Sequence, residues 1–343
     1  MMVMSRAAAA GPNLIVNGNE YIGDAGTGKF TQHSGTHAVN RVISGYDGNG
    51  GPIYDGGNLY LGYSTYGYGR YEIYGGELTV DSLFVGYDGT SDFVQDGGTV
   101  TVAYEMNVGT KVYGTYGLSG DAILDASEAT VYVGREACSF GAFNQGGGTL
   151  TAVWMDAGSE GSGIVTHWNG SATVLNSLVL GRHSDGQGTY QLIPGNAGVT
   201  LTTKETVVGA YGNGYFLQQK DDIGTNESTH TTNTLVLGYN IEGYGKYELK
   251  GGQLTSTYQR IGMEGTGEFI QTGGTNTVSN RMVIGQELTA LGKYELSGGT
   301  LNANQIRNND RFLFSGGTLN VNTFTNKGRF QGVGAINPYT AGA

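Results

Sequence analysis

The sequence predicts an all-β fold, a single-stranded parallel β-solenoid (a right-handed β-helix) with about 23 to 25 residues in each coil and roughly 14 coils. Three observations predict it: 63 of the 343 residues are glycine, short apolar runs ending in glycine recur at a near-constant spacing, and the intervening segments alternate polar and apolar residues. Such alternation between glycines is typical of strands. This glycine content excludes a mostly helical protein, because each interior glycine costs a helix ~1 kcal/mol relative to alanine.

Two interleaved series of glycines set the period. One closes the short apolar runs, at steps of mostly about 23 to 25 residues that stretch to about 29 around Gly209 and Gly238. The other consists of glycine pairs such as Gly75-Gly76. We expect glycine at these corners to adopt positive φ and to let successive backbones stack closely. The closing glycines of the structural repeat are Gly62, Gly86, Gly109, Gly134, Gly181, Gly209, Gly238, Gly262 and Gly285.

Two triplets recur inside the coils and predict the core. One is Phe-x-Gln, as in Phe93-Val94-Gln95, and the other is Tyr-x-aliphatic, as in Tyr247-Glu248-Leu249; from Tyr190 onward the two alternate. The first and third residues of a strand triplet share a face, so we expect both to point inward and to stack in columns. Each inward Gln then needs hydrogen bonds within the core, because an unpaired buried amide costs about 1–3 kcal/mol. The middle residue is expected to face water.

Regularity is lost near both ends, which suggests the boundaries. We assign residues 1–12 to a leader remnant or N-terminal cap, 13–336 to the solenoid, and 337–343 to a tail or truncated continuation. Residues 299–334 shorten to Gly-Gly-Thr-Leu-Asn units. A solenoid exposes open strand edges at each end and needs caps. No polar cap is evident after Ile336, so we expect the chain to continue or to pair end to end.

The repeats resemble those of exported bacterial β-helical proteins. Units such as GTGEFIQTGGTNTVSNRMVIG (265–285) and GKYELSGGTLNANQI (292–306) are similar to the coils of autotransporter passenger regions and of surface proteins that carry a PEP-CTERM sorting tail. The segment TFTNKGRFQGVGAI (323–336) is similar to the last passenger coils of that group. The resemblance implies an extracellular or cell-surface location and a structural or adhesive role. The right-handed winding is inferred from the coil length and from this resemblance.

The charge and the cysteine content bear on which partners, metals and disulfides the protein is expected to have. The net charge is -11 and the 18 Lys and Arg residues are scattered, so we see no basic patch for nucleic acid. No run of 18 apolar residues exists, and direct membrane insertion is not expected. The single Cys138 has no partner for a disulfide or a metal site, and we expect a small, buried or half-buried apolar residue. The sequence predicts no cofactor and no metal.

Three motifs imitate chemical sites. The segment from Gly23 to Phe30 is one residue from a phosphate-binding loop, but Phe30 takes the place of the required Ser or Thr, and the equivalent repeat has Glu268 where Lys29 stands. His33 and His37 have a metal-like spacing, yet their repeat equivalents are Thr272 and Asn276, so we expect exposed turn residues. Residues 46–51 resemble a calcium loop without the closing Glu, which leaves at most a weak ion site.

Carboxylates receive attention because right-handed β-helices include polysaccharide lyases and hydrolases, which need acidic residues converging on one face. Glu72, Glu248 and Glu295 share one repeat position, so we interpret them as solvated ladder residues. Insertions in a solenoid map to loops on one face and often carry function. The acidic candidates are Asp81, Asp88, Asp92 and Asp96 in one coil, and Asp221 and Asp222 beside Lys220 in an irregular insertion from Gln218 to Asn233.

Tyrosines are the better binding candidates. Tyr63, Tyr66 and Tyr68 are expected in a turn after Leu61-Gly62, where exposed rings with polar tips suit stacking on sugars or docking of a protein. The alternative is corner packing that covers the solenoid edge.

These observations favour a structural or adhesive solenoid rather than an enzyme: a rigid rod that presents contacts to glycans or surface proteins. Two alternatives stay open. One is a polysaccharide-degrading lyase or hydrolase with a site near Asp88–Asp96 or Asp221–Asp222, and the other is a fibre subunit that stacks end to end.

Overall fold

The computed structural model describes residues 5–8, 13–49, 51–221, 224–333 and 336–337. The chain divides into two compact units. Unit 1 runs to Met155 and includes Gly161–Gly163, and unit 2 comprises Asp156–Glu160 and the chain from Ile164. Both units are all-β, and the described residues contain no helix that could cross a membrane.

Each coil has three straight segments. In the coil built from β8 (Tyr68–Ile73) and β9 (Glu77–Val85), the short strand is the first segment. The parallel pairing of the long strand with β11 (Thr99–Val108) is interrupted: the register shifts between Val102 and Glu105 of β11. This irregularity divides the long strand into two halves. We therefore call its two halves the second and third segments. A closing glycine follows the third segment, as predicted from the short apolar runs.

The strands follow one another in a regular series. Strands of unit 1, with β14 continuing beyond it, are β1 (Ser5–Ala8), β2 (Leu14–Asn17), β3 (Glu20–Ile22), β4 (Thr27–Gln32), β5 (Thr36–Tyr46), β6 (Pro52–Gly56), β7 (Asn58–Leu61), β8, β9, β10 (Thr90–Gln95), β11, β12 (Tyr113–Leu118), β13 (Ile123–Val133) and β14 (Phe140–Ala157). The remaining strands, which lie in unit 2 apart from the first two residues of β15, are β15 (Ser162–Leu180), β16 (Gln187–Leu192), β17 (Val199–Val208), β18 (Asn213–Gln218), β19 (Ser228–Leu237), β20 (Tyr244–Leu249), β21 (Gln253–Ile261), β22 (Thr266–Gln271), β23 (Thr275–Ile284), β24 (Leu291–Leu296), β25 (Thr300–Asn308), β26 (Arg311–Phe314), β27 (Thr318–Asn326), β28 (Arg329–Gly332) and β29 (Ile336–Asn337).

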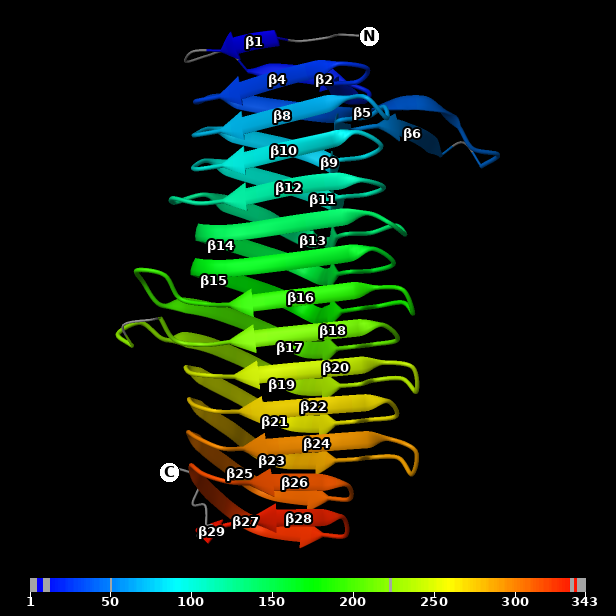
Figure 1. Cartoon of the computed structure of the whole chain (residues 1–343). Coiled ribbons are helices and arrows are strands. Elements are labelled where there is room, and N and C mark those ends of the chain that lie inside the picture. The colour runs from blue at the N-terminus through cyan, green and yellow to red at the C-terminus, as the bar shows by residue number, and fades with distance from the viewer. Residues whose placement is uncertain (1–4, 9–12, 50, 222–223, 334–335, 338–343) are drawn as a thin grey trace. The chain divides into compact units, whose positions relative to one another are not determined.

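First segments pair with first segments of the next coil, in parallel, as in β8 with β10 and β10 with β12. In Figure 1 these strands run in front from right to left, and the other segments return behind them, so each unit winds as a right-handed helix. The described strands supply seven first segments that begin in unit 1 and seven that begin in unit 2, which agrees with the roughly 14 coils predicted. The fold prediction is therefore confirmed.

The ends of the predicted solenoid differ in detail. Ser5–Ala8, within the region assigned to a leader remnant or cap, forms β1 and pairs in register with Lys29–Gln32 of β4. Toward the other end, Tyr294 pairs with Phe312, and Phe312 with Phe330, so these coils advance by only 18 residues. The shortening expected over 299–334 is confirmed. Residues 338–343 of the predicted tail lie outside the described residues.

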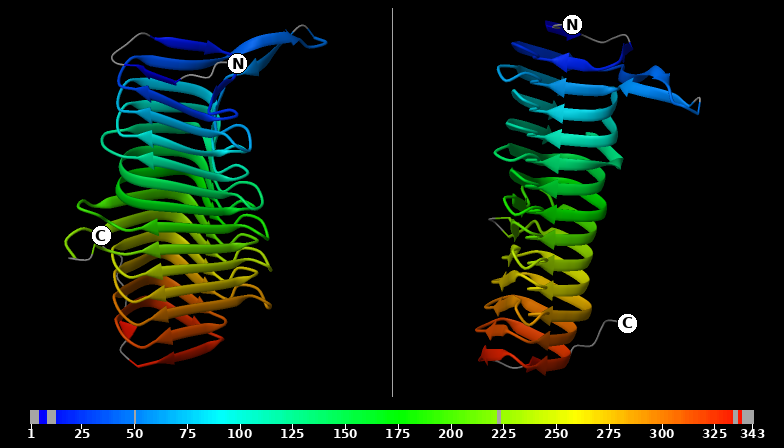
Figure 2. Two further views of the ribbon diagram at one scale, coloured as in Figure 1. Left: turned by 45° about the horizontal axis from the view of Figure 1, so that its top comes forward. Right: turned by 90° about the vertical axis from the view of Figure 1, so that its right-hand side faces the viewer.

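One hairpin interrupts unit 1. The second half of β5 pairs antiparallel with β6, from Arg41 opposite Gly56 to Tyr46 opposite Pro52. Figure 2 shows from two directions that this hairpin projects away from the coils of its unit. It lies within the long step from Gly23 to Gly62, and the sequence analysis did not identify it.

Aromatic rings of the first segments form a buried column in each unit, as the triplets predicted. Neighbouring rings are parallel, with centroids 4.7 Å apart for Phe93 and Tyr116 and 4.5 Å apart for Phe216 and Tyr247. Burial of such rings makes the largest apolar contribution to the core. The column contains Phe30, Tyr71, Phe93, Tyr116 and Phe143 in unit 1, and Tyr190, Phe216, Tyr247, Phe269, Tyr294 and Phe312 in unit 2.

Four of the five inward glutamines accept a hydrogen bond from the tyrosine of the following coil, which explains why the two triplets alternate there. Tyr247 donates its hydroxyl hydrogen to Oε1 of Gln218 at 2.6 Å, while Nε2 of Gln218 donates to two backbone carbonyls at 3.1 and 3.0 Å. The same bond joins Tyr71 to Gln32 at 2.7 Å in unit 1. Gln145 is the exception, because β15 (Ser162–Leu180), which follows it, contains no tyrosine. Tyr116 and Tyr294 make the equivalent bonds to Gln95 and Gln271.

Three second-segment residues add another partner to these hydroxyls. Nδ1 of His37 lies 2.8 Å from the Tyr71 hydroxyl, Nδ1 of His230 lies 3.0 Å from that of Tyr247, and Asn276 donates to Tyr294 at 3.1 Å. His33 is exposed, as expected. His37 and its repeat equivalent Asn276 are 1% and 0% exposed, so the expectation that His37 is an exposed turn residue was wrong. Each is the second residue of a strand that begins just after the turn, and the strand directs it inward.

Cys138 also differs from the expectation. It was predicted to be buried or half-buried, but it is exposed in the turn before β14 and has a positive φ of 65°. A turn, rather than apolar packing, determines its position.

Candidate binding surface

Five aromatic rings meet on the outer side of the third segments of unit 1; we call Tyr21, Tyr60, Tyr63, Phe84 and Tyr87 the five-ring cluster. Tyr21, Tyr60 and Phe84 occupy matching positions in register on β3, β7 and β9, and their rings stack with centroids 5.2 and 4.6 Å apart. Tyr63 and Tyr87 each follow a closing glycine and stack on each other at 5.2 Å. Their edges contact the column at 4.7 to 5.6 Å.

The cluster has a buried base and an exposed rim. Phe84 is 7% exposed and Tyr63 is 36% exposed. Burial raises the pKa of Tyr60 to about 12, so its hydroxyl stays neutral and polar at physiological pH. The Lys111 ammonium lies 4.6 Å from the Tyr87 ring centroid, a cation–π distance. Rings held edge to face, with hydroxyls at the rim, can stack on the apolar face of a sugar or receive an apolar side chain.

The three predicted tyrosines separate in the structure. Tyr63 belongs to the five-ring cluster and thus also covers the solenoid corner, while Tyr66 is 91% exposed and stands apart from the cluster. Tyr68 was expected in the turn, but it is the first residue of β8. Its hydroxyl donates to Oδ2 of Asp92 at 2.6 Å, and this bond raises the pKa of Tyr68. The bond to Asp92 therefore holds the Tyr68 side chain against the outer surface of the first segments.

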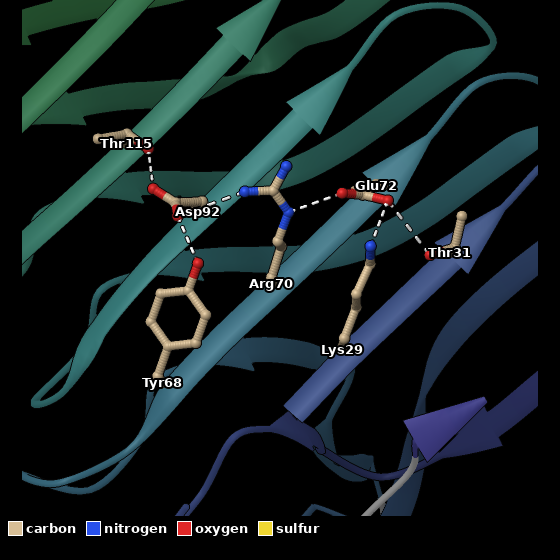
Figure 3. A network of polar contacts seen from close by, with 7 residues as sticks. All are labelled: Lys29, Thr31, Tyr68, Arg70, Glu72, Asp92 and Thr115. Atoms are coloured by element: carbon tan, nitrogen blue, oxygen red, sulfur yellow. Dashed lines mark hydrogen bonds and ion pairs between the residues drawn. The ribbon is translucent and has the colours of Figure 1, made fainter. Parts of the chain in front are cut away.

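Tyr68 belongs to a polar network on the outer side of the first segments of unit 1 (Figure 3). Glu72 binds Lys29 at 2.9 Å and Arg70 at 2.6 Å, and Asp92 accepts hydrogen bonds from Tyr68 and Thr115. Burial opposes ionisation of Glu72, but the bonds from Lys29 and Arg70 hold its pKa below the usual value. Glu72 is only 6% exposed, so its prediction as a solvated residue was wrong.

Unit 2 repeats this arrangement. Glu248 binds Lys246 at 2.6 Å and Lys250 at 3.0 Å and accepts a hydrogen bond from Tyr215 at 2.9 Å. Burial opposes its ionisation, and these three bonds outweigh burial and lower its pKa to about 2. Tyr244 donates to Glu268 of the next coil at 3.3 Å, as Tyr68 does to Asp92. Because the network recurs at the same repeat position in both units, we interpret it as part of the coil framework.

The four aspartates of one coil do not form one acidic group. Asp81 pairs with Arg41 at 2.7 Å, Asp88 accepts from Thr65 at 3.0 Å, and Asp96 accepts from Ser119 at 2.6 Å. With Asp92 in the polar network, each carboxylate has partners of its own.

Asp221 closes a local turn in the insertion. Its carboxylate accepts hydrogen bonds from the Thr225 backbone amide at 2.7 Å, the Thr225 hydroxyl at 2.9 Å and the Asn226 amide at 2.9 Å. Burial opposes ionisation, but these bonds lower the pKa of Asp221. Asp222 lies outside the described residues.

The other two motifs have structural partners as well. The segment after Gly23 enters strand β4, as the repeat predicted, and Lys29 in it binds Glu72. Oδ1 of Asp47 accepts hydrogen bonds from the backbone amides of Asn49 and Gly51, both at 2.8 Å, which lowers its pKa and holds it within the hairpin turn. No group of three His, Cys, Asp or Glu side chains suited to a metal occurs among the residues with described positions.

The projecting hairpin is an exposed surface that sequence reasoning missed. Ile43, Tyr46 and Tyr54 are 54%, 68% and 53% exposed. Its base is fixed by Arg41, whose guanidinium carbon lies 5.3 Å from the Tyr54 ring centroid and 5.0 Å from that of Tyr104. The available signal was the long step between closing glycines, which shows an insertion but not its conformation.

Four rings of the five-ring cluster were also missed. Tyr21, Tyr60 and Phe84 are the first residues of the short apolar runs, and stacking them in register gives the outer column.

Comparisons with protein-family models, with curated proteins and with solved structures find no match to this chain.

Proposed function

We propose that the protein is an extracellular structural or adhesive solenoid whose outer surface presents contacts to glycans or proteins. The five-ring cluster carries this proposal. A solenoid needs only small or aliphatic residues at the outer position of the third segment, and unit 2 has Val179, Val207 and Val236 there. Unit 1 places Tyr21, Tyr60 and Phe84 at that position instead, with Tyr63 and Tyr87 beside them. A departure from the repeat on one face is where solenoids present binding surfaces.

Two further observations support binding without chemistry. Each described aspartate of the proposed acidic sites is held by its own hydrogen bond or ion pair, which leaves it little freedom for acid–base catalysis. The resemblance of the repeats to exported β-helical proteins supports the extracellular location. We therefore prefer an adhesive role to hydrolysis or elimination of a polysaccharide.

The test is a glycan array probed with the whole chain and with the variant Tyr63→Ala. We expect the wild-type protein to bind neutral saccharides on the array. The variant should bind the same saccharides with an affinity lower by about fivefold to tenfold, because one exposed ring is removed. Tyr211→Ala is the control, since Tyr211 is a comparably exposed tyrosine of unit 2. Equal losses in both variants, or release of new reducing ends from any bound saccharide, would refute the proposal.

A further inference from the structure

We infer that unit 2 carries a binding site for an acidic saccharide, formed by Arg260, Arg281 and Arg307. The three lie on the third segments of consecutive coils, in β21, β23 and β25 (Figure 1). They line one cavity of about 380 Å³ together with Tyr258, Gln286 and Glu287. This site lies in the other unit from the five-ring cluster and does not depend on the function proposed for that cluster.

Two of the three arginines, Arg260 and Arg307, replace apolar residues of the repeat. In register, the outer column of the third segments runs Val207, Val236, Arg260, Val283 and Arg307. The earlier valines are covered by apolar neighbours, in a cluster that includes Val179 and Ala210. The coil therefore does not need a guanidinium at this position.

The arginines also have no acidic partner among the described residues. The ion pairs of the described chain involve other cations, and Arg307 makes only a hydrogen bond to the Asn309 side-chain oxygen at 3.0 Å. By contrast, Arg135 is paired with Glu105 at 2.8 Å, and Arg41 with Asp81 at 2.7 Å. In a protein with a net charge of -11, three arginines without a described acidic partner gather at one cavity.

The lining suits a sugar that bears negative charge. Guanidinium groups bind carboxylates and sulfates through paired, charge-assisted hydrogen bonds. Arg281 stands directly opposite Tyr258 on the neighbouring strand, and the Tyr258 hydroxyl accepts a hydrogen bond from Asn280 at 2.9 Å, which fixes the ring beside the charge. An aromatic ring next to guanidinium groups offers a stacking face for the sugar and donors for its anionic groups.

The cavity continues along the unit. A second cavity of about 560 Å³ shares Gln286, Glu287 and Arg307 with the first and adds Lys327. Arg260 and Arg307 are two coils apart, about 10 Å at the usual strand spacing, with Arg281 on the coil between them. Charges repeated along the coils fit an oligosaccharide with charges on successive sugars. Nucleic acid is less suitable, since binders typically contact about six to ten phosphates.

The test measures binding of a galacturonic acid oligomer to the whole chain by calorimetry at low salt, with neutral dextran, sulfated dextran and single-stranded DNA as parallel ligands. We expect both acidic saccharides to bind and neutral dextran not to bind. Arg281→Gln should weaken that binding about tenfold or more, because a charge-assisted contact is lost. Raising the salt should weaken it further, since ions screen exposed charges.

Lys293→Gln is the matched control, because it also removes one positive charge from unit 2 but from a first segment, where Lys293 pairs with Glu295 at 3.0 Å. It should leave binding within about twofold of wild type. The inference is overturned if neither acidic saccharide binds, if neutral dextran binds equally well, if DNA binds more tightly than both saccharides, or if the two variants lose the same affinity. Circular dichroism of both variants confirms that the fold is kept.

Discussion

Removing one buried hydroxyl in the variant Tyr247→Phe tests the bond that joins successive coils. The Tyr247 hydroxyl bridges Oε1 of Gln218 at 2.6 Å and Nδ1 of His230 at 3.0 Å, and all three side chains are fully buried. Because the hydroxyl donates to Gln218, Nδ1 of His230 is the donor to it, and Nε2 accepts from Thr206 at 3.1 Å. The chain of donors and acceptors is thus complete, and each group depends on the next.

The magnitude follows from what the substitution leaves unpaired. Phenylalanine keeps the ring stacked on Phe216 and Phe269, at 4.5 and 5.0 Å, so little apolar contact is lost. A buried acceptor and a buried donor lose their partner, at about 1–3 kcal/mol each. We expect the free energy of unfolding to fall by about 2 to 4 kcal/mol, toward the lower half of that sum, because small shifts can recover part of the loss.

The assay is denaturant unfolding followed by circular dichroism, arranged as a double-mutant cycle with His230→Leu. Leucine stands at the same register position in both neighbouring coils, as Leu201 and Leu254, so the position accepts it. The double variant should lose about 1 to 2 kcal/mol less than the sum of the single variants, since the two changes remove the same hydrogen bond. A loss below about 0.5 kcal/mol for Tyr247→Phe, or strict additivity, would refute the reasoning.

Three further predictions concern pH, glycine and cysteine. Burial lowers the pKa of His230 to about 3, against about 6.5 when unfolded, so stability falls as pH drops from about 6.5 toward 3. Between pH 7 and pH 5 we expect this histidine to remove about 2 kcal/mol. Burial also lowers the pKa of His167, to about 4, so thermal melts of His230→Leu should show a stability loss about 2 kcal/mol smaller than that of wild type, but not zero. Gly238→Ala should cost more than about 2 kcal/mol in denaturant unfolding, because Gly238 has φ of +64° and an added Cβ would meet the Thr266 carbonyl oxygen, whereas Gly198→Ala, with its nearest contact at 3.5 Å, should change little. Cys138 should react fully with a thiol reagent in the native protein, because its side chain is exposed; reaction only after denaturation would contradict the structure.

Much of the coil framework could be predicted from the sequence, because the repeated glycines mark the corners and the repeated triplets mark the core strands. The nine closing glycines have φ between 62° and 79°, and the Phe-x-Gln and Tyr-x-aliphatic triplets form the core columns. The need to satisfy an inward Gln was also predictable from the cost of a buried amide. Its partner was not, because the Tyr hydroxyl comes from the next coil and is recognised only once the register is known.

The surface could not be predicted for the same reason. Tyr21 and Tyr60 are 39 residues apart in sequence, and Tyr60 and Phe84 are 24 apart, yet the three rings stack in one column. Arg260, Arg281 and Arg307 appear scattered along the chain, and stacking in register places them in one cavity. His37 was misassigned because a shift of one residue at the start of a strand turns a side chain from solvent to core.

Hydrogen exchange with a bound saccharide tests most directly the claim that the outer third segments bind ligands while the buried columns only build the coil. For a neutral saccharide retained on the glycan array, we predict slower exchange in β3, β7, β9 and the turns that hold Tyr63 and Tyr87, with the first segments unchanged. Protection centred instead on the insertion from Gln218 to Asn233, together with a shortened saccharide after incubation, would contradict the account and favour an enzyme.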